Sequence, residues 1–175
     1  MQMMINMLEA GKPDRADARQ LELYDLARRV SPPREVGGRP GASPHGWASA
    51  LNKLGYGKYR SMTLPTMEKA LRRAARQMRL TGKPVGLIVW GGGHSWVMSG
   101  YKATADPART DDFDVIAVWV EDPWHRWRDA TWGRGLAPHT RLEPDELSRW
   151  FVDATFGREP RPGARERYII IAPLK

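Results

Sequence analysis

A histidine and an aspartate lie at the ends of two segments with the pattern of neighbouring strands. His94 follows three glycines in GGGHSWVMSGY, and Asp122 ends the apolar run VIAVWVED. A carboxylate that accepts a hydrogen bond from one imidazole nitrogen fixes the tautomer and leaves the other nitrogen as a base. The pair therefore predicts the base and the orienting residue of a hydrolytic site, which also requires a nucleophile or a water.

The pairing of the two segments decides whether these side chains meet. In an antiparallel hairpin centred on Arg109, Trp96 lies opposite Asp122 and His94 lies opposite Trp124. His94 and Asp122 then occupy one face on a diagonal, about 7–8 Å apart at the backbone. A shift of one residue in the connecting loop would place them on opposite faces. The shared face also points to the core, because it carries Trp96, Met98, Ile116, Val118 and Val120.

Other interpretations of the same residues stand beside this one. The spacing fits a purely structural hydrogen bond between His94 and Asp122 equally well. A serine nucleophile is not favoured, because Ser95 follows His94 in a strand and points to the opposite face. Ser43 and Ser49 lie in or near a predicted helix start, where capping explains them.

The composition indicates one globular domain without cysteine chemistry. The chain has 175 residues, 41% of them hydrophobic, with eight tryptophans, which suits a single domain with a substantial core. No cysteine is present, which excludes disulfides, thiolate metal sites and a cysteine nucleophile within the chain. No apolar run approaches the roughly 20 residues of a membrane span, and no signal-peptide pattern opens the sequence. The four histidines lack ligand spacing, so neither a metal nor another cofactor is expected: His45, His94, His125 and His139.

The net charge of +8 allows a nucleic-acid or acidic partner, but composition explains it more simply. The chain has 21 arginines and 7 lysines with abundant Ala, Gly and Pro, a bias typical of GC-rich genomes. The basic stripe over residues 69–79 is interpreted as a solvated helix face or a docking surface for an acidic partner. A second basic segment alternates Trp124, Trp127 and Trp132 with Arg126, Arg128 and Arg134. The favoured interpretation is a loop that packs its tryptophans over a cleft edge with arginines outward, and the alternative is a stacking surface for single-stranded nucleic acid or sugar.

Hydrophobic periodicity predicts helices first and strands later. Helices are expected over residues 1–11, with Gly11 closing the first, around residues 23–30, from Ser43 to Gly55, over 65–80, and over 143–157. Strands are expected over residues 84–90, 94–104, 113–122 and 167–174. The sequence thus predicts a single α+β domain, in which residues 1–82 form a helical part and residues 83–175 form a mostly antiparallel sheet.

The order of these parts resembles the papain-like cysteine peptidases, and within them the bacterial family that removes double-glycine leaders from bacteriocins. The resemblance rests on GKPVGLIVW, GGHSWVMSGY and VEDPW, followed by LEPDELSRWF, and it covers nearly the whole chain. It implies a papain-like fold, a peptide or protein substrate, His94 as general base and Asp122 as its orienting partner. It also implies a substrate cleft beside Gly92, Gly93, Trp96 and Trp124.

One departure from the family pattern concerns the nucleophile. In that family a Gln-x-x-x-x-x-Cys-Gly-Pro motif opens the first helix, where the helix dipole and the histidine favour a thiolate. MQMMINML resembles the stretch that follows this motif, so the cysteine and the oxyanion-hole glutamine have no counterpart here. Either an N-terminally shortened peptidase-like protein or a pseudoenzyme is expected. The alternative from another class is a non-enzymatic basic module that binds nucleic acid or an acidic protein.

The chain as written is expected not to hydrolyse peptides, because no residue matches the nucleophile. The measurement is mass spectrometry of a leader-type peptide incubated with the purified protein. Hydrolysis that His94→Ala abolishes would show that the chain carries its own nucleophile.

Overall fold

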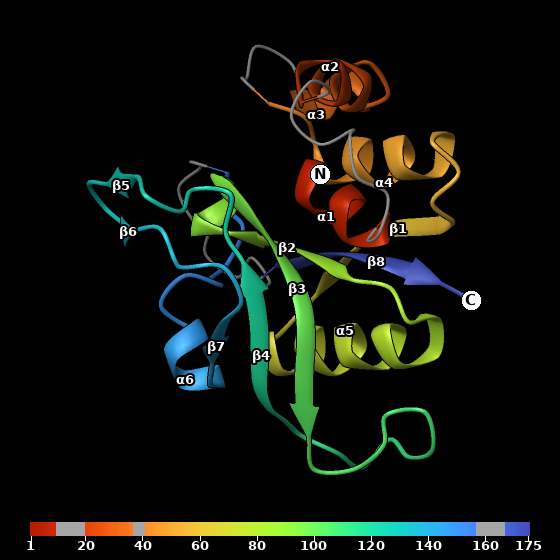
Figure 1. Ribbon diagram of the computed structural model, residues 1–175, viewed down its shortest axis with the longest axis vertical. Coiled ribbons are helices and arrows are strands. Elements are labelled where there is room, and N and C mark those ends of the chain that lie inside the picture. Colours follow the sequence, from red (N-terminus) through yellow and green to blue (C-terminus); the bar gives the residue numbers. More distant parts are fainter. Residues whose placement is uncertain (10–19, 37–40, 157–166) are drawn as a thin grey trace.

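The computed structural model describes residues 1–9, 20–36, 41–156 and 167–175 (Figure 1). The first helix, α1, is closed at Glu9 in this structure, and the predicted closing residue Gly11 lies outside the described residues. The α-helices are α1 (Gln2–Leu8), α2 (Gln20–Arg29), α3 (Pro33–Val36), α4 (Pro44–Lys53), α5 (Met67–Thr81) and α6 (Pro144–Leu147), with one 3-10 turn, η1 (Trp90–Gly92).

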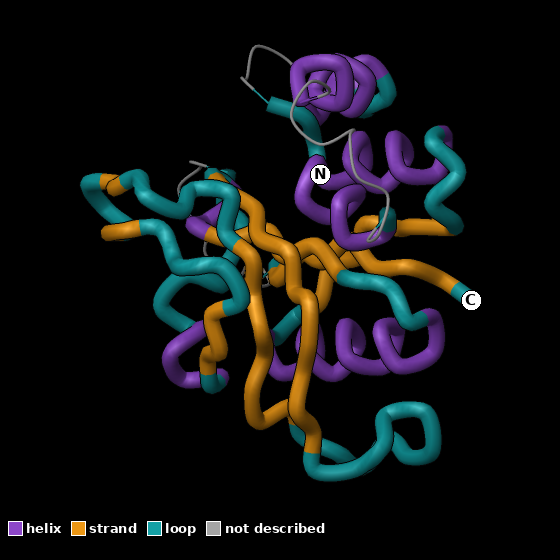
Figure 2. The backbone as a smooth tube through the Cα atoms, in the orientation of Figure 1, coloured by secondary structure: helices purple, strands orange, loops and turns teal. Residues whose placement is uncertain are grey.

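Of the eight strands in the described residues, six form one antiparallel sheet in the order β1-β8-β2-β3-β4-β7 (Figure 2). The remaining two, β5 and β6, form a short separate ribbon. This confirms the predicted α+β class with an antiparallel sheet. The strands are β1 (Lys58–Leu64), β2 (Val85–Val89), β3 (His94–Ala103), β4 (Val115–Glu121), β5 (Arg128–Asp129), β6 (Gly133–Arg134), β7 (Thr140–Leu142) and β8 (Tyr168–Leu174).

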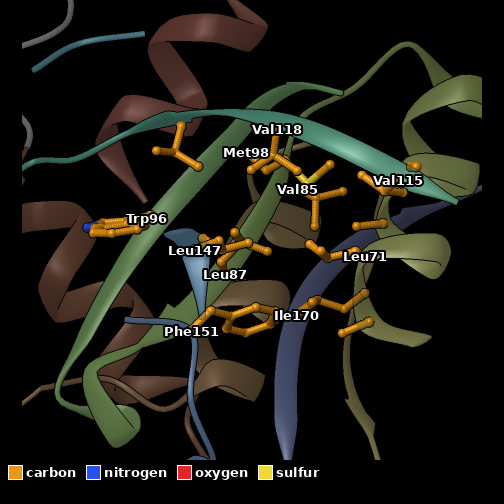
Figure 3. Packing of buried hydrophobic residues seen from close by; sticks show 14 of the residues in the cluster. Leu71, Val85, Leu87, Trp96, Met98, Val115, Val118, Leu147, Phe151 and Ile170 are labelled. Atoms are coloured by element: carbon orange, nitrogen blue, oxygen red, sulfur yellow. The ribbon is translucent and has the colours of Figure 1, made fainter. Parts of the chain in front are cut away.

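The main sheet is covered by helices on both faces, and the two faces carry separate cores. One core joins α5 and α6 to the sheet through residues such as Leu71, Leu147 and Ile170 (Figure 3). The other joins α1, α2 and α4 to the sheet through residues such as Met4 and Trp47. Burial of two apolar faces suits a sheet whose central strand β2 is apolar at almost every position.

Strand β1 belongs to the part of the chain, residues 1–82, that the sequence predicted as helical. It pairs along its whole length with β8, from Lys58 opposite Leu174 to Leu64 opposite Tyr168. The pairing places a strand from the first half of the chain beside β8 at the edge of the sheet. Sequence patterning missed this strand because its short edge segment KYRSMTL is only partly buried.

Capping side chains hold the starts of α4 and α5. The Ser43 hydroxyl accepts a hydrogen bond from the Gly46 amide at 3.0 Å at the start of α4. Thr66 accepts from the Lys69 amide at 3.2 Å at the start of α5, and Gly82 ends α5 with a left-handed φ of 67°. The predicted start of the third helix at Ser43 is therefore confirmed.

The register of β3 and β4 agrees with the predicted hairpin near the catalytic candidates. Val97 lies opposite Glu121 and Met98 opposite Val120, so the ladder extended by one residue places Trp96 opposite Asp122. Two register shifts interrupt the pairing farther along, the first after Met98 and the second before Ala103. Because the second shift reverses the first, the pairing at the far end returns to the predicted register.

The second register shift also explains why one residue predicted in the core is exposed. Ile116 was expected on the inner face of β4, but its side chain is 38% exposed and Val115 is buried in its place. The register shift beside Ala103 changes the alternation at this point, and it turns Ile116 to the solvent.

The helix expected over residues 143–157 is α6, and it ends after one turn. The chain then leaves the helical path because its backbone bonds elsewhere: the Trp150 carbonyl accepts from the Trp90 amide at 2.8 Å, and the Ala154 amide donates to the Arg167 carbonyl at 2.9 Å. A segment predicted as helix thus ties η1 to the start of β8. A further short helix, α3, forms in a stretch that was predicted as loop.

The loop between β3 and β4 is held by arginines of α5. Arg79 binds both carboxylate oxygens of Asp106 at 3.0 Å. Arg76 donates to the carbonyl oxygens of Pro107 at 2.8 Å and Thr110 at 2.6 Å. The bidentate pair and the two backbone contacts fix where the loop turns, and with it the relation of the two strands.

Arginines of the basic stripe on α5 contact other parts of the same chain. The guanidinium groups of Arg72 and Arg76 also lie over the ring of Phe113, 5.1 and 5.6 Å from its centre. Arg72, Arg76 and Arg79 therefore bind their own chain. These contacts give the three arginines a structural role that the interpretation of residues 69–79 as a solvated helix face did not include, and docking of an acidic partner stays a prediction.

Removing one of these arginines will test the role of the loop contacts. Arg76→Ala is expected to lower the free energy of unfolding by about 1–3 kcal/mol, because two backbone carbonyls lose a charged donor. Arg73→Ala on the same helix is the matched control, since Arg73 is exposed, and its effect is expected within about 0.5 kcal/mol. Equal effects of the two substitutions in urea denaturation would contradict this role.

Candidate active site

His94 begins β3 directly after a tight turn at the end of β2. Trp90, Gly91 and Gly92 all have positive φ angles, of 57°, 61° and 101°. A side chain on Gly92 would begin 2.5 Å from the ring of Phe156, so only glycine fits at this position. Gly91 and Gly92 therefore allow the sharp turn after which the chain reverses direction and begins β3 at His94.

The imidazole of His94 is hydrogen-bonded to the carboxylate of Asp122. The His94 Nε2 to Asp122 Oδ1 distance is 2.8 Å, which confirms the predicted contact between the two side chains. The Asp122 side chain is fully buried and that of His94 is 13% exposed. The contact makes Nε2–H the donor, which leaves Nδ1 as the nitrogen with basic character.

The Asp122 carboxylate is held by the backbone as well as by His94. Oδ1 also accepts from the Trp124 amide at 2.8 Å, and Oδ2 accepts from the Leu136 amide at 2.9 Å. Burial acts to raise the pKa of Asp122, but the hydrogen bonds from His94, Leu136 and Trp124 outweigh it, and the net pKa lies below the ordinary value. The residue is therefore an anion in the folded protein at neutral pH.

Aromatic rings surround the imidazole. The Trp90 ring lies 4.2 Å from the His94 ring, tilted by 31°, and the Trp124 ring lies 6.0 Å away at a steep angle. Trp132 stacks on Trp90 with ring centres 6.2 Å apart. These rings restrict the orientation of His94 and shield its contact with Asp122 from water.

The predicted cleft residues divide into two groups in the structure. Gly92 and Gly93 line a cavity, and Trp124, 40% exposed, lies beside His94. Trp96 does not reach the surface: it is 1% exposed and packs in the core at one end of the cluster in Figure 3. Trp96 shares the His94 face of β3, but it lies two residues in from the strand end, within the core that includes Leu147 of α6.

The cavity has a volume of about 760 Å³ and lies between the helical layer and the strand end that carries His94. Its walls come from α3, the start of α4, the η1 turn and the residues that precede β8. Sequence reasoning missed Arg34, His45 and Arg167 in this wall. They lie far apart in the sequence, and only the GGG turn marks the place where they meet.

The first helix lies on the other face of the sheet. Met4 and Ile5 of α1 pack in the core that contains Ile88 and Val97, whereas His94 pairs with Val89 on the opposite face. The resemblance places a nucleophile at the leading end of this helix. The described start of α1 therefore packs on the sheet face away from the His94 side chain.

The basic tryptophan loop after Asp122 contributes two rings to the site. Trp124 and Trp132 contact His94 and Trp90, while Trp127 is 66% exposed. The three arginines of this loop are exposed, as predicted: Arg126, Arg128 and Arg134. The loop closes one side of the site and presents a basic rim to solvent.

Comparison of the chain with models of known families, with curated proteins and with solved structures gave no match. The assignment of the site therefore rests on its residues and their geometry. Among the residues that the structure describes, no group of three potential ligands is placed to hold a metal ion. No helix within the described ranges is long and apolar enough to cross a membrane.

Substitution of Asp122 will test how the carboxylate holds the site. Asp122→Asn replaces one acceptor by an amide group, which leaves the part-buried Leu136 N–H without its acceptor and is expected to cost about 1–3 kcal/mol of stability at neutral pH. Because the folded pKa is lowered, this stabilisation is present above about pH 4, the ordinary carboxyl value, and is lost as the pH falls through the folded pKa.

Urea denaturation at pH 7 and pH 3 gives the measurement. The stability difference between the native protein and Asp122→Asn is expected to shrink at pH 3. Asp114→Asn is the control, since Asp114 is exposed and its substitution should change little at either pH. A difference for Asp122→Asn that stays constant with pH would contradict the role assigned to the anion.

Proposed function

We propose that the chain is a papain-like, peptidase-related domain that binds peptides beside His94. The buried hydrogen bond between His94 and Asp122 is the observation that carries the proposal. In this arrangement Asp122 orients the ring, and Nδ1 of His94 is the base toward a bound group. A structural pair needs no open surface nearby, whereas this pair stands next to a cavity at a glycine turn.

The architecture supports the same proposal. Helices come before most strands of the antiparallel sheet in the chain. Helix α5 follows the edge strand β1 in sequence and precedes the central strand β2, which leads to the glycine turn. The cavity lies where the helical layer meets the sheet ends, which is a common place for a substrate cleft. The order GKPV, GGH, DPW of the sequence coincides with β2, the start of β3 and the end of β4.

The chain as printed lacks the group that would complete hydrolysis. It contains no cysteine, and the candidate serines have other roles or positions. The Ser43 hydroxyl caps α4, and Ser95 lies on the strand face opposite His94. The proposed activity of this chain is therefore peptide binding, with the base and orienting residues of a peptidase site retained.

The basic-module alternative loses part of its support in the structure. Arg72, Arg76 and Arg79 bind the loop between β3 and β4 and the Phe113 ring. The remaining candidate surface is the rim formed by Arg126, Arg128 and Arg134. Single-stranded nucleic acid would stack on exposed tryptophan there, since Trp127 is accessible.

Peptide titration followed by backbone amide NMR will test the proposal. Peptides are expected to shift the amide signals of Gly92, Gly93, His94 and Trp124 without being cleaved. His94→Ala should change the shifts at neighbouring residues while the fold remains. Shifts that avoid this set of residues in every peptide tested would overturn the proposal.

Retention on heparin separates the two function classes. A nucleic-acid module loses affinity steeply with salt, by about 0.9 logarithmic units per tenfold salt for each phosphate contact. We expect weak retention that is lost at low salt. Strong retention that the combined change of Arg126, Arg128 and Arg134 to Gln abolishes would favour the basic module.

A further inference from the structure

The cavity beside the glycine turn combines an apolar floor with charged walls. Its apolar surface includes Trp90, Phe156 and Ile169. Arg34 enters from α3, and Arg167 enters from the residue that precedes β8. The two guanidinium groups therefore come from segments at opposite ends of the chain and share one hollow.

The charges in this wall are unbalanced. Glu35 is the one carboxylate among the described lining residues, and its oxygens lie 3.0 Å from Nδ1 of His45. Among the described residues, neither Arg34 nor Arg167 has a side-chain ion pair. Two cationic side chains thus face a hollow whose only acidic group already has a partner, which favours an anionic ligand.

The position of the cavity connects it to the proposed site. Gly93 lines the cavity and directly precedes His94, and Trp90 lines it while its ring lies 4.2 Å from the His94 ring. A volume of about 760 Å³ holds more than one side chain of a ligand. Trp90 and Gly93 thus connect the cavity to the His94 site.

We propose that the cavity recognises a carboxylate group on a peptide ligand. Arg34 and Arg167 bind the carboxylate, and the floor around Phe156 and Ile169 holds an adjacent apolar side chain. The choice of a peptide rests on the proposed function, whereas the preference for a carboxylate rests on the charges of the cavity. An acidic side chain and a free C-terminus supply the same group, and the experiment separates them.

Calorimetric binding of three matched hexapeptides will test the proposal. The first is built from alanine and leucine with one central glutamate and is blocked at both ends. The second has glutamine in place of glutamate, and the third is the glutamine peptide with a free C-terminus. The glutamate peptide is expected to bind about three- to tenfold more tightly than the blocked glutamine peptide at low salt. The third peptide matches the first only if a terminal carboxylate also fits.

Variants of the two arginines locate the effect. Arg34→Gln and Arg167→Gln are each expected to reduce the preference for glutamate by about two- to fivefold, because exposed charge pairs are partly screened. Arg60→Gln on β1 removes the same charge outside the cavity and should leave the preference unchanged. All three positions are exposed, so thermal melts should confirm that each variant folds.

The outcomes separate this inference from the proposed function. Equal binding of the blocked glutamate peptide and the blocked glutamine peptide, with amide shifts at His94, would overturn the carboxylate site and leave peptide binding intact. Binding of N-acetylglutamate amide that depends on Arg34 and Arg167, without any peptide binding, would retain the carboxylate site and overturn the peptidase-related proposal. A preference that Arg60→Gln removes equally would overturn the cavity as its source.

Discussion

A buried carboxylate is costly unless donors satisfy its oxygens, and the site is built around this requirement at Asp122. Its two oxygens accept from the His94 ring, the Trp124 amide and the Leu136 amide. These donors come from the start of β3, from the turn after β4 and from the segment that returns after β6. Three parts of the chain therefore converge on one side chain, and the orientation of His94 follows from their agreement.

That convergence requires the strands β3 and β4 to keep their register near His94. Two register shifts lie along this pair, and they cancel between Met98 and Ala103. Arg76 and Arg79 of α5 bind the connecting loop through the Asp106 carboxylate and loop carbonyl groups. A basic helix face that resembles a binding surface in the sequence is thus part of the scaffold that aligns the site.

The arginines of the described residues include some that bind the chain itself and others that are exposed. The arginines on one face of α5 bind the chain itself. The arginines that line the cavity and those of the tryptophan loop are exposed to solvent. The apolar rings of Trp90, Trp124 and Trp132 sit between these two basic regions and enclose the imidazole. Aromatic rings therefore lie directly against His94, and exposed basic side chains of the tryptophan loop lie close by in the sequence.

The sequence by itself determined the cap of α4 at Ser43, the α+β class and the meeting of His94 with Asp122, because these depend on local patterns and a short hairpin register. It did not reveal β1, the exposure of Ile116 or the early end of α6, since each depends on backbone bonds to distant segments. Only the tertiary structure decided that Trp96 is buried and that Arg34 and Arg167 share a cavity. Their proximity arises from long-range packing, which no spacing within the chain encodes.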